Sequence, residues 1–281
     1  SAGNHAQGVA FSAKYFGIEA TIVMPESTPL TKVMGVKEFG ATVILHGSNY
    51  DEAYAYAVTF GEENNYSFVH PFTDDEVMSG QGTITLEMFE DIDDLDALVV
   101  PVGGGGLISG MSVASKALNP ECKIIGISAA GAPAMKNSYD AKTAIDTTSV
   151  RTIADGIAVR DTSPITLEYI LNNVDVFETV GEDEIASAIL FLLEKQKVLV
   201  EGAGAVGVAA LLEATSQSAN AADWNFGDLS ITFDSNFTLA TSIRTEERDF
   251  NLIGHSNQPG LDWTGYNAAT NVIYPSADVW A

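Results

Sequence analysis

The sequence predicts an α/β fold of two lobes, each built around a mainly parallel, twisted sheet flanked by helices. Short β-branched segments alternate with longer amphipathic ones, which is the pattern of successive strand and helix units. Of the 281 residues, 46% are hydrophobic and 18% are charged, a balance that supports a sizeable core and excludes a disordered or fibrous chain. A proline and an acidic cluster interrupt the alternation at 70–76 (HPFTDDE), and we place the crossing between the lobes there.

Each expected element follows from this alternation. The β-branched segments predict strands at 20–25, 41–47, 97–102, 123–128, 174–180 and 197–201. The amphipathic segments predict helices at 4–16, 29–39, 50–63, 75–92, 107–118, 164–172, 182–195 and 204–214. Pro29 and Gly40 flank the second helix in the order typical of helix starts and ends.

The chain is expected to divide into a first lobe at 1–72, a second lobe at 73–250 and an unassigned tail at 251–281. The character of the sequence changes after about residue 215, where all three tryptophans lie and lysine is absent. The tail shows no clear period, so no element is predicted in it.

The charge balance restricts the partners. Asp and Glu number 38 against 13 Lys and Arg, which gives a net charge of −25 and leaves no basic surface for nucleic acid or anionic lipid. No apolar stretch approaches the roughly 20 residues that span a bilayer, so no membrane segment is expected. The single cysteine, Cys122, indicates a reducing, cytoplasmic location. The opening residues SAGNHAQG lack a signal-peptide pattern and read like the start of a fragment cut inside a motif.

Four consecutive glycines, Gly103 to Gly106, lie in VVPVGGGGLISGM between an expected strand and an expected helix. Glycines leave backbone N–H groups open at a helix N-terminus, where the dipole also favours an anion, so we predict a phosphate cradle. A flexible turn is the alternative. Neither Walker A nor GxGxxG fits, which argues against ATP. On this interpretation, Gly104→Asp abolishes cofactor binding and leaves the fold largely intact.

Two further motifs are less specific. GAGAVG at 202–207 matches the GxGxxG pattern after an expected strand, and Asp234 ends a later expected strand, so a nicotinamide-binding site is a possible interpretation. The negative charge of Glu201 argues against a pyrophosphate at this position. SAGNHAQG at 1–8 offers donors for a carboxylate, or Asn4 serves only as an N-cap. No histidines occur at metal-ligand spacing; we expect His46, His70 and His255 to be surface or core residues, not ligands.

Several long motifs occur together and in order. They are SAGNHAQGVA, ATIVMPESTPLTKV, ATVILHGSNYDEA, GQGT, VVPVGGGGLISG, GAPAM, TIADGIAVR and VEGAGAVGVAALL. Over about residues 1–215 the chain resembles the threonine dehydratase (threonine ammonia-lyase) and serine racemase branch of the pyridoxal-phosphate enzymes with the tryptophan synthase β-like fold. With this resemblance, the nicotinamide site becomes a remote alternative.

The resemblance implies pyridoxal 5′-phosphate as the cofactor and assigns residues to it. The residues implied to hold the phosphate are Gly103, Gly104, Gly105, Gly106 and Leu107. Asn4 corresponds to a residue that contacts the cofactor's ring hydroxyl, and Gly156 to a glycine that lies against the cofactor. The loop implied to hold the substrate carboxylate is Ser1, Ala2, Gly3, Asn4 and His5. The first lobe is then the small lobe that closes over substrate.

The sequence also departs from the family pattern. The Schiff-base lysine of the family lies upstream of the asparagine loop, so we expect it upstream of Ser1 and expect no catalytic residue in this chain. Ala2 stands where racemases carry a second serine, which favours elimination. No divalent-cation site is expected, because Ser128, Ala132 and Ala134 stand where cation-dependent relatives supply acids. The segment at 233–248 echoes the family's SGGN segment with Asn236 in step, but Phe233 or Asp234 replaces the serine that faces the pyridine nitrogen.

The implied activity is that of a threonine/serine dehydratase. Such an enzyme removes the β-hydroxyl of L-threonine or L-serine and releases 2-oxobutanoate or pyruvate plus ammonia. We expect a homo-oligomer that is inactive as this fragment. The alternative is a non-catalytic module that binds phosphorylated ligands or a partner chain.

Overall fold

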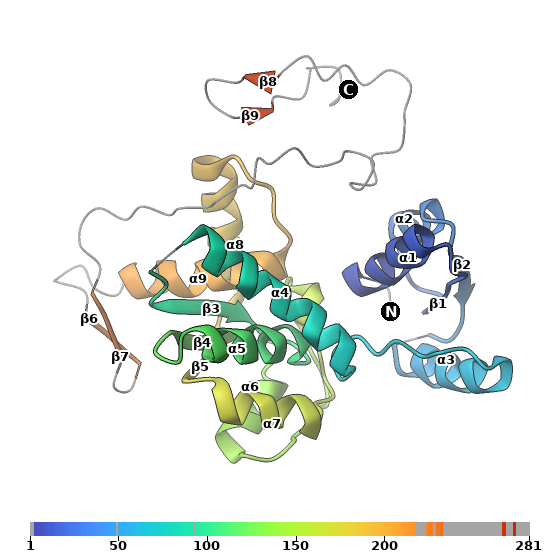
Figure 1. The fold of residues 1–281 in the computed structure, drawn as a ribbon, viewed down its shortest axis with the longest axis horizontal. Helices are drawn as coiled ribbons and strands as arrows, with labels where there is room; N and C mark the ends of the chain where they lie inside the picture. The colour runs from blue at the N-terminus through green and yellow to red at the C-terminus, as the bar shows by residue number, and fades with distance from the viewer. Residues whose placement is uncertain are drawn as a thin grey trace. The chain divides into compact units, whose positions relative to one another are not determined.

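The computed structural model describes residues 3–48, 50–92, 94–216, 223–226, 229–232, 266–267 and 272–273 (Figure 1). Residues 1–237 form one unit and residues 238–281 form another. The first unit contains two parallel sheets, each with helices packed against it, and it holds nearly all of the predicted site residues.

The first sheet lies between residues 21 and 45. Its elements in chain order are α1 (Asn4–Phe16), β1 (Thr21–Met24), α2 (Leu30–Glu38), β2 (Thr42–Leu45) and α3 (Tyr50–Asn64). β1 and β2 pair in parallel, with Thr21 opposite Thr42. Ala6 and Ala10, one turn apart on α1, are buried against Met24 and Val36, so the helix contributes its small-residue face to this core.

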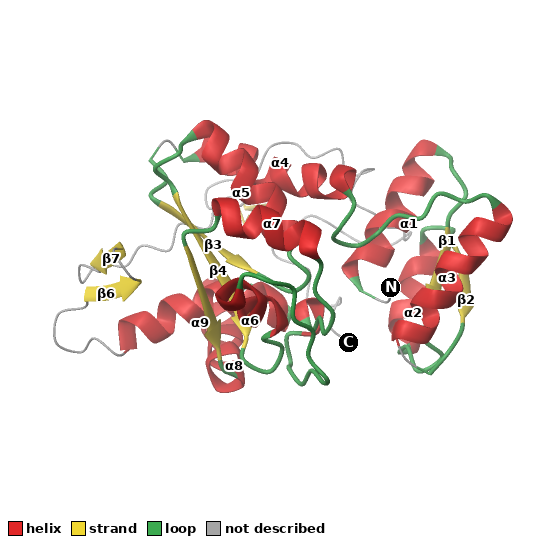
Figure 2. Cartoon of the chain, turned by 90° about the horizontal axis from the view of Figure 1, so that it is seen from below, coloured by secondary structure: helices red, strands yellow, loops and turns green. Residues whose placement is uncertain are grey.

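The second sheet has three parallel strands in the order β3-β4-β5. Its elements are α4 (Asp75–Asp91), β3 (Ala97–Pro101), α5 (Gly106–Leu118), β4 (Lys123–Ala129), α6 (Ala134–Ala141), the 3₁₀ turn η1 (Asp155–Ile157), α7 (Pro164–Asn173), β5 (Val176–Val180), α8 (Glu182–Phe191), the π-helical segment η2 (Leu192–Gln196) and α9 (Gly202–Ser216). Figure 2 shows α4, α5 and α7 on one side of this sheet and α8 and α9 on the other. Because β4 is central and covered on both faces, Ile124, Ile125 and Ile127 are at most 1% exposed.

Helices α4 and α5 cross closely because both carry a glycine at the contact. A Cβ at Gly82 would lie 3.0 Å from the carbonyl oxygen of Gly110, and a Cβ at Gly110 would run into the carbonyl oxygen of Met78. The second glycine of the GQGT motif is therefore required by packing against α5, the helix that begins at the tetraglycine loop.

The expected architecture is confirmed: five strands form parallel sheets flanked by helices. Two antiparallel pairs follow, formed by β6 (Asp223–Phe226) with β7 (Leu229–Thr232) and by β8 (Tyr266–Asn267) with β9 (Val272–Ile273). Of these strands only β7 was predicted, as part of the strand expected to end at Asp234. Asp234, Asn236 and His255 lie outside the described residues, as does most of the 251–281 tail. The boundary between the two expected lobes stays a prediction.

One prediction of local structure was wrong, and helix α6 was missed. The strand expected at 197–201 is irregular backbone, because the π-helical segment ends at Lys197 in the left-handed conformation (φ 58°) and Val198 donates back to Leu192. Helix α6 was not predicted, since its eight residues are too few to show a long apolar period and Pro133 precedes it. In addition, α9 begins at Gly202, two residues earlier than expected.

Candidate functional site

The tetraglycine loop connects the end of β3 to the start of α5. Gly105 is the residue before the helix and has φ +91°, a backbone conformation that side chains rarely adopt. Gly104, Gly105 and Gly106 are buried. In the described part of the chain, no acceptor receives a hydrogen bond from the N–H groups of residues 103–107, whereas Val102 and Ser109 on either side are paired.

Close packing explains why these positions are glycine. A Cβ at Gly103 would lie 2.8 Å from the Cα of Ile157, and one at Gly105 would lie 2.9 Å from the Cβ of Thr166. A Cβ at Gly104 would lie 2.5 Å from the ring of Phe72. The expectation that Gly104→Asp leaves the fold intact is therefore wrong, because any side chain there displaces Phe72.

Packing does not explain the unpartnered N–H groups. Buried backbone N–H groups are almost always hydrogen-bonded, and leaving one without a partner costs free energy comparable to a lost hydrogen bond. Three consecutive buried glycines with free N–H groups at a helix N-terminus therefore suit an anion, which is stabilised by the N–H groups and by the helix dipole. The residues present fit the phosphate of pyridoxal phosphate.

The second part of the site is the contact between α9 and the turn at 153–157. A Cβ at Gly156 would lie 3.0 Å from the Cβ of Ala203, and one at Gly202 would lie 2.5 Å from the carbonyl oxygen of Ile153. Gly202 and Gly207 of GAGAVG therefore serve close packing of helix α9, of which the whole motif is part. They follow no strand and form no loop, so the nicotinamide interpretation is wrong.

The third part is the segment at the start of α1. The Asn4 side chain donates from Nδ2 to Oε2 of Glu201 over 3.0 Å, just before α9. Gly3 is the N-cap and no side-chain cap bond is present at this helix, so Asn4 is not an N-cap. Ser1 and Ala2 lie outside the described residues.

The two histidines near the crossing segment hold it in place. His5 Nε2 lies 3.1 Å from the carbonyl oxygen of Val69, and burial lowers the pKa of His5. His70 Nδ1 accepts from the N–H groups of Phe72 (3.3 Å) and Thr73 (3.1 Å), which requires an unprotonated Nδ1. Burial, and next the charge of His5, lower the pKa of His70, which favours this neutral form. The segment thereby places Phe72 against Gly104 and Gly106.

These contacts bring the predicted residues into one chain of neighbours. Asn4 is hydrogen-bonded to Glu201, Ala203 of α9 packs against Gly156, and Ile157 packs against Gly103. Sequence reasoning missed Phe72 and Thr166 as neighbours of the loop and Glu201 as the partner of Asn4. The HPF and VEGAGAVG motifs contained two of these three residues, but not their contacts.

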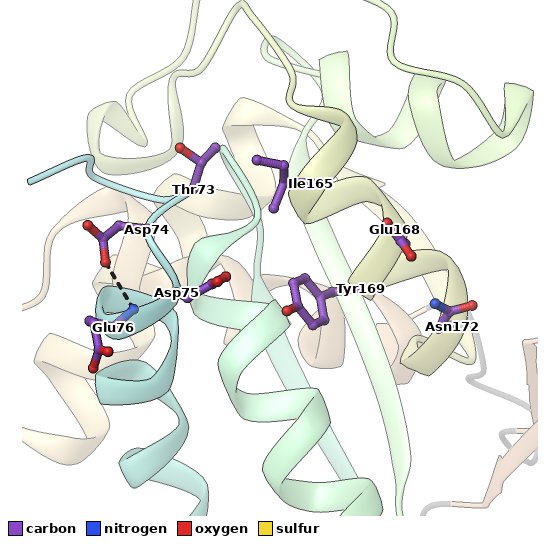
Figure 3. A pocket seen from close by; sticks show the side chains of 8 residues that line it. All are labelled: Thr73, Asp74, Asp75, Glu76, Ile165, Glu168, Tyr169 and Asn172. Atoms are coloured by element: carbon purple, nitrogen blue, oxygen red, sulfur yellow. Dashed lines mark hydrogen bonds between the residues drawn. The ribbon is translucent and has the colours of Figure 1, made fainter. Parts of the chain in front are cut away.

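A separate cavity lies between the start of α4 and α7. It has a volume of about 570 Å³ and is lined by Thr73, Asp74, Asp75, Glu76, Ile165, Glu168, Tyr169 and Asn172 (Figure 3). Asp74 Oδ1 accepts from the N–H of Glu76 over 2.9 Å, so this carboxylate caps α4. Four carboxylates around the cavity make it a poor place for a phosphate, which separates it from the tetraglycine site.

No group of histidine, cysteine and acidic side chains within the described residues could hold a metal ion. Of the three positions noted for cation-dependent relatives, Ser128 is buried and donates to the carbonyl oxygen of Val102 over 2.8 Å. No helix in the part of the chain that the structure describes is long and apolar enough to cross a membrane.

Comparison with known proteins identifies the family. The family described as "Pyridoxal-phosphate dependent enzyme" matches residues 1–224, which is most of the chain. This chain belongs to the pyridoxal-phosphate dependent enzyme family. The resemblance stated from the motifs is confirmed, and the cofactor of the family is the one that the tetraglycine loop fits.

Among relatives within the family, the chain is 54% identical over 212 residues to an L-threonine ammonia-lyase of Thermotoga maritima, covering 75% of this chain and 53% of that protein. The processed form of threonine deaminase isoform 2 from Solanum lycopersicum superposes with a TM-score of 0.72 at 37% identity, covering 74% of this chain and 58% of that one. Maize serine racemase superposes with a TM-score of 0.74 at 35% identity, covering 78% and 67%. The tryptophan synthase β-like fold class is confirmed.

The match has limits in length. The chain spans about half the length of the curated L-threonine ammonia-lyases it matches: 53% of the Thermotoga maritima protein and 53% of one from Geobacter sulfurreducens. A second family, "Protein of unknown function (DUF1302)", matches residues 202–274. The match to pyridoxal-phosphate dependent enzymes ends at residue 224, before the 233–248 segment that was compared with SGGN.

Proposed function

We propose that this chain forms the cofactor-binding body of a pyridoxal-phosphate dependent threonine ammonia-lyase. The reaction converts L-threonine to 2-oxobutanoate and ammonia, and L-serine to pyruvate and ammonia. The observation that carries the proposal is the set of buried, unpartnered N–H groups at Gly104, Gly105 and Gly106 in a chain 54% identical to an L-threonine ammonia-lyase.

Each predicted residue has a role in this proposal. The N–H groups of the tetraglycine loop and Leu107 bind the phosphate, and Gly156 provides a close approach without a side chain. Asn4, whose side-chain amide is oriented by Glu201, binds the ring hydroxyl of the cofactor. The loop that binds the substrate carboxylate consists of Ser1, Ala2, Gly3, Asn4 and His5. The bound cofactor supplies an electron sink for the substrate's α-carbon.

We propose that the enzyme catalyses elimination and not racemisation. We also propose that it distinguishes threonine from serine only through the additional methyl group of threonine. Ala2 offers no hydroxyl for proton transfer on the second face of the substrate. One methyl group in a pocket is worth only about 1 to 3 kcal/mol, so both substrates react.

Cofactor binding by the chain itself tests the proposal. In equilibrium dialysis, pyridoxal phosphate is expected to bind at least about tenfold more tightly than pyridoxal, because only the former carries the anion. Leu107→Glu adds a negative charge in the first turn of α5 and should remove at least about tenfold of this preference. Leu107→Gln loses the same leucine packing without the charge and should keep the preference. Equal affinity for both ligands in the unmodified chain would refute the phosphate site.

A non-catalytic phosphate-binding module is the second candidate. The positions of the lysines favour this candidate. We propose that none of the nine lysines forms the Schiff base with the cofactor, so that the catalytic lysine is one that these 281 residues do not supply. Lys32 is paired with Asp155, the residue before Gly156, over 2.7 Å.

We also propose the expected lobes at 1–72 and 73–250, a cytoplasmic location and a homo-oligomer. The single cysteine, Cys122, is free and buried, which accords with a reducing compartment. Two exposed leucines, Leu190 in α8 and Leu199 in the irregular segment after η2, offer apolar surface to a second copy. Light scattering after gel filtration measures the oligomeric state.

A further inference from the structure

Thr166 contacts the tetraglycine loop from α7 and is completely buried. Its Oγ1 lies 2.8 Å from the carbonyl oxygen of Gly104 and 3.4 Å from that of Ser163. A hydroxyl has one proton to donate, and the shorter contact is the better hydrogen bond, so Thr166 donates to Gly104. Its Cβ lies 2.9 Å from the point that a Cβ at Gly105 would occupy.

This hydrogen bond acts on the peptide that joins Gly104 to Gly105. The peptide is planar and trans, so its carbonyl oxygen and its N–H group point in opposite directions. Fixing the oxygen of Gly104 on Thr166 therefore also fixes the direction of the Gly105 N–H, which has no partner in the described part of the chain.

The same peptide would otherwise be free to turn over. Both of its residues are glycines, and turning the plane by about 180° would carry Gly105 from φ +91° into the negative-φ region that is equally open to glycine. In the turned state a carbonyl oxygen replaces the N–H group, and a carbonyl dipole repels a phosphate.

We propose that Thr166 is a positioning residue that locks the Gly104–Gly105 peptide in the orientation that binds an anion. It touches neither substrate nor cofactor and acts only through the loop. The proposal rests on the proposed function, because it assigns a cause to the phosphate preference of the same site.

The matched variants are Thr166→Val and Thr166→Ser. Valine keeps the shape that packs beside Gly105 and removes the hydroxyl, whereas serine keeps the hydroxyl and removes the methyl group. Equilibrium dialysis with pyridoxal phosphate and with pyridoxal gives the preference of each protein for the phosphorylated ligand, independently of catalysis. Thr166→Ser should keep the preference within about twofold, and Thr166→Val should lose roughly tenfold, the size of one hydrogen bond's contribution. The affinity for pyridoxal should stay the same in both.

A measurement without a variant covers the case in which Thr166→Val does not fold. In the unmodified chain labelled with ¹⁵N-glycine, the amide resonance of Gly105 should shift when inorganic phosphate is added. An unmoved Gly105 resonance at saturating phosphate overturns the lock.

The dialysis outcomes separate the two claims. If the unmodified chain prefers the phosphorylated ligand and Thr166→Val prefers it equally, or if Thr166→Ser loses as much as Thr166→Val, the lock is wrong and the phosphate site stands. If the unmodified chain binds pyridoxal phosphate and pyridoxal equally well, the proposed phosphate site is wrong, and the positioning role of Thr166 is then wrong as well.

Discussion

Asp175 is the residue that ties the second sheet region together at one end. Its Oδ2 accepts from Lys116 at the end of α5 (2.8 Å) and from the N–H of Ile124 in β4 (2.8 Å), and Lys123 lies 3.5 Å from Oδ1. Burial acts to raise the pKa of Asp175, but the hydrogen bonds from Lys116 and Ile124 and the two lysine charges outweigh it and lower the pKa.

Asp175→Asn should therefore destabilise the fold in a pH-dependent way. Because the folded pKa is lowered, the charged Asp175 stabilises the fold above the unfolded pKa of about 4, and this stabilisation is lost as the pH falls through the folded pKa. We expect a loss of about 1 to 2 kcal/mol at pH 7, measured by urea unfolding, that shrinks steadily below pH 4.

Asp140→Asn is the control for the Asp175 variant. Asp140 pairs with Lys136 over 2.6 Å, but its side chain is 57% exposed, so the loss should stay within about 0.5 kcal/mol. A loss at Asp175 that is the same at pH 7 and pH 3 would contradict the assignment.

At the scale of elements, the glycines of α9 have different tasks. Gly202 is buried against the turn before Gly156, whereas Gly204 is exposed and has ordinary space for a side chain, with Val200 Cβ at 3.8 Å. Gly202 therefore packs against the turn and has no room for a side chain, whereas Gly204 is a helical position that can accept one.

Gly202→Ala should destabilise the protein, and Gly204→Ala should not. The new Cβ at Gly202 would lie 2.5 Å from the carbonyl oxygen of Ile153, and relieving this overlap costs about 1 to 3 kcal/mol. At Gly204 the better helix propensity of alanine should add about 0.5 to 1 kcal/mol. Thermal unfolding of the two variants compares them directly, and a stabilised Gly202→Ala would show that α9 does not dock on this turn.

For the whole molecule, charge repulsion is a large term. A net charge of −25 over 281 residues opposes the compact state, and salt screens it over a Debye length of about 10 Å at 0.1 M. The thermal midpoint should rise from dilute buffer into molar potassium chloride, with most of the rise below about 0.5 M. A flat or falling midpoint counts against repulsion, and a rise confined to higher salt would indicate exclusion of salt from the surface instead.

The whole chain is also the scale at which catalysis is tested. We expect the 281-residue protein to release no 2-oxobutanoate from L-threonine and to yield no lysine adduct after borohydride reduction with the cofactor, because we propose that none of its nine lysines is the Schiff-base lysine. Mass spectrometry of the reduced protein and a 2-oxo-acid assay provide the two readouts. A lysine adduct together with steady turnover would mean that one of the nine lysines has the catalytic role.

Local sequence patterns were sufficient for much of the fold. Alternating β-branched and amphipathic segments place β1 to β5 and most helices, because the period of apolar residues reports which face is buried. The segment at 197–201 shows the limit: its residues favour a strand, but Lys197 ends a π-helical segment in a left-handed conformation and no ladder forms there.

The sequence by itself determined the family, the tetraglycine loop and the type of ligand, since each rests on residues that are neighbours in the chain. The tertiary structure alone decided which residues support the loop and which glycine motif lies inside a packed helix. Thr166 lies 62 positions from Gly104, and Glu201 lies 197 positions from Asn4. Such contacts depend on how the helices pack on the sheets, and packing is a property of the whole chain that no local pattern contains.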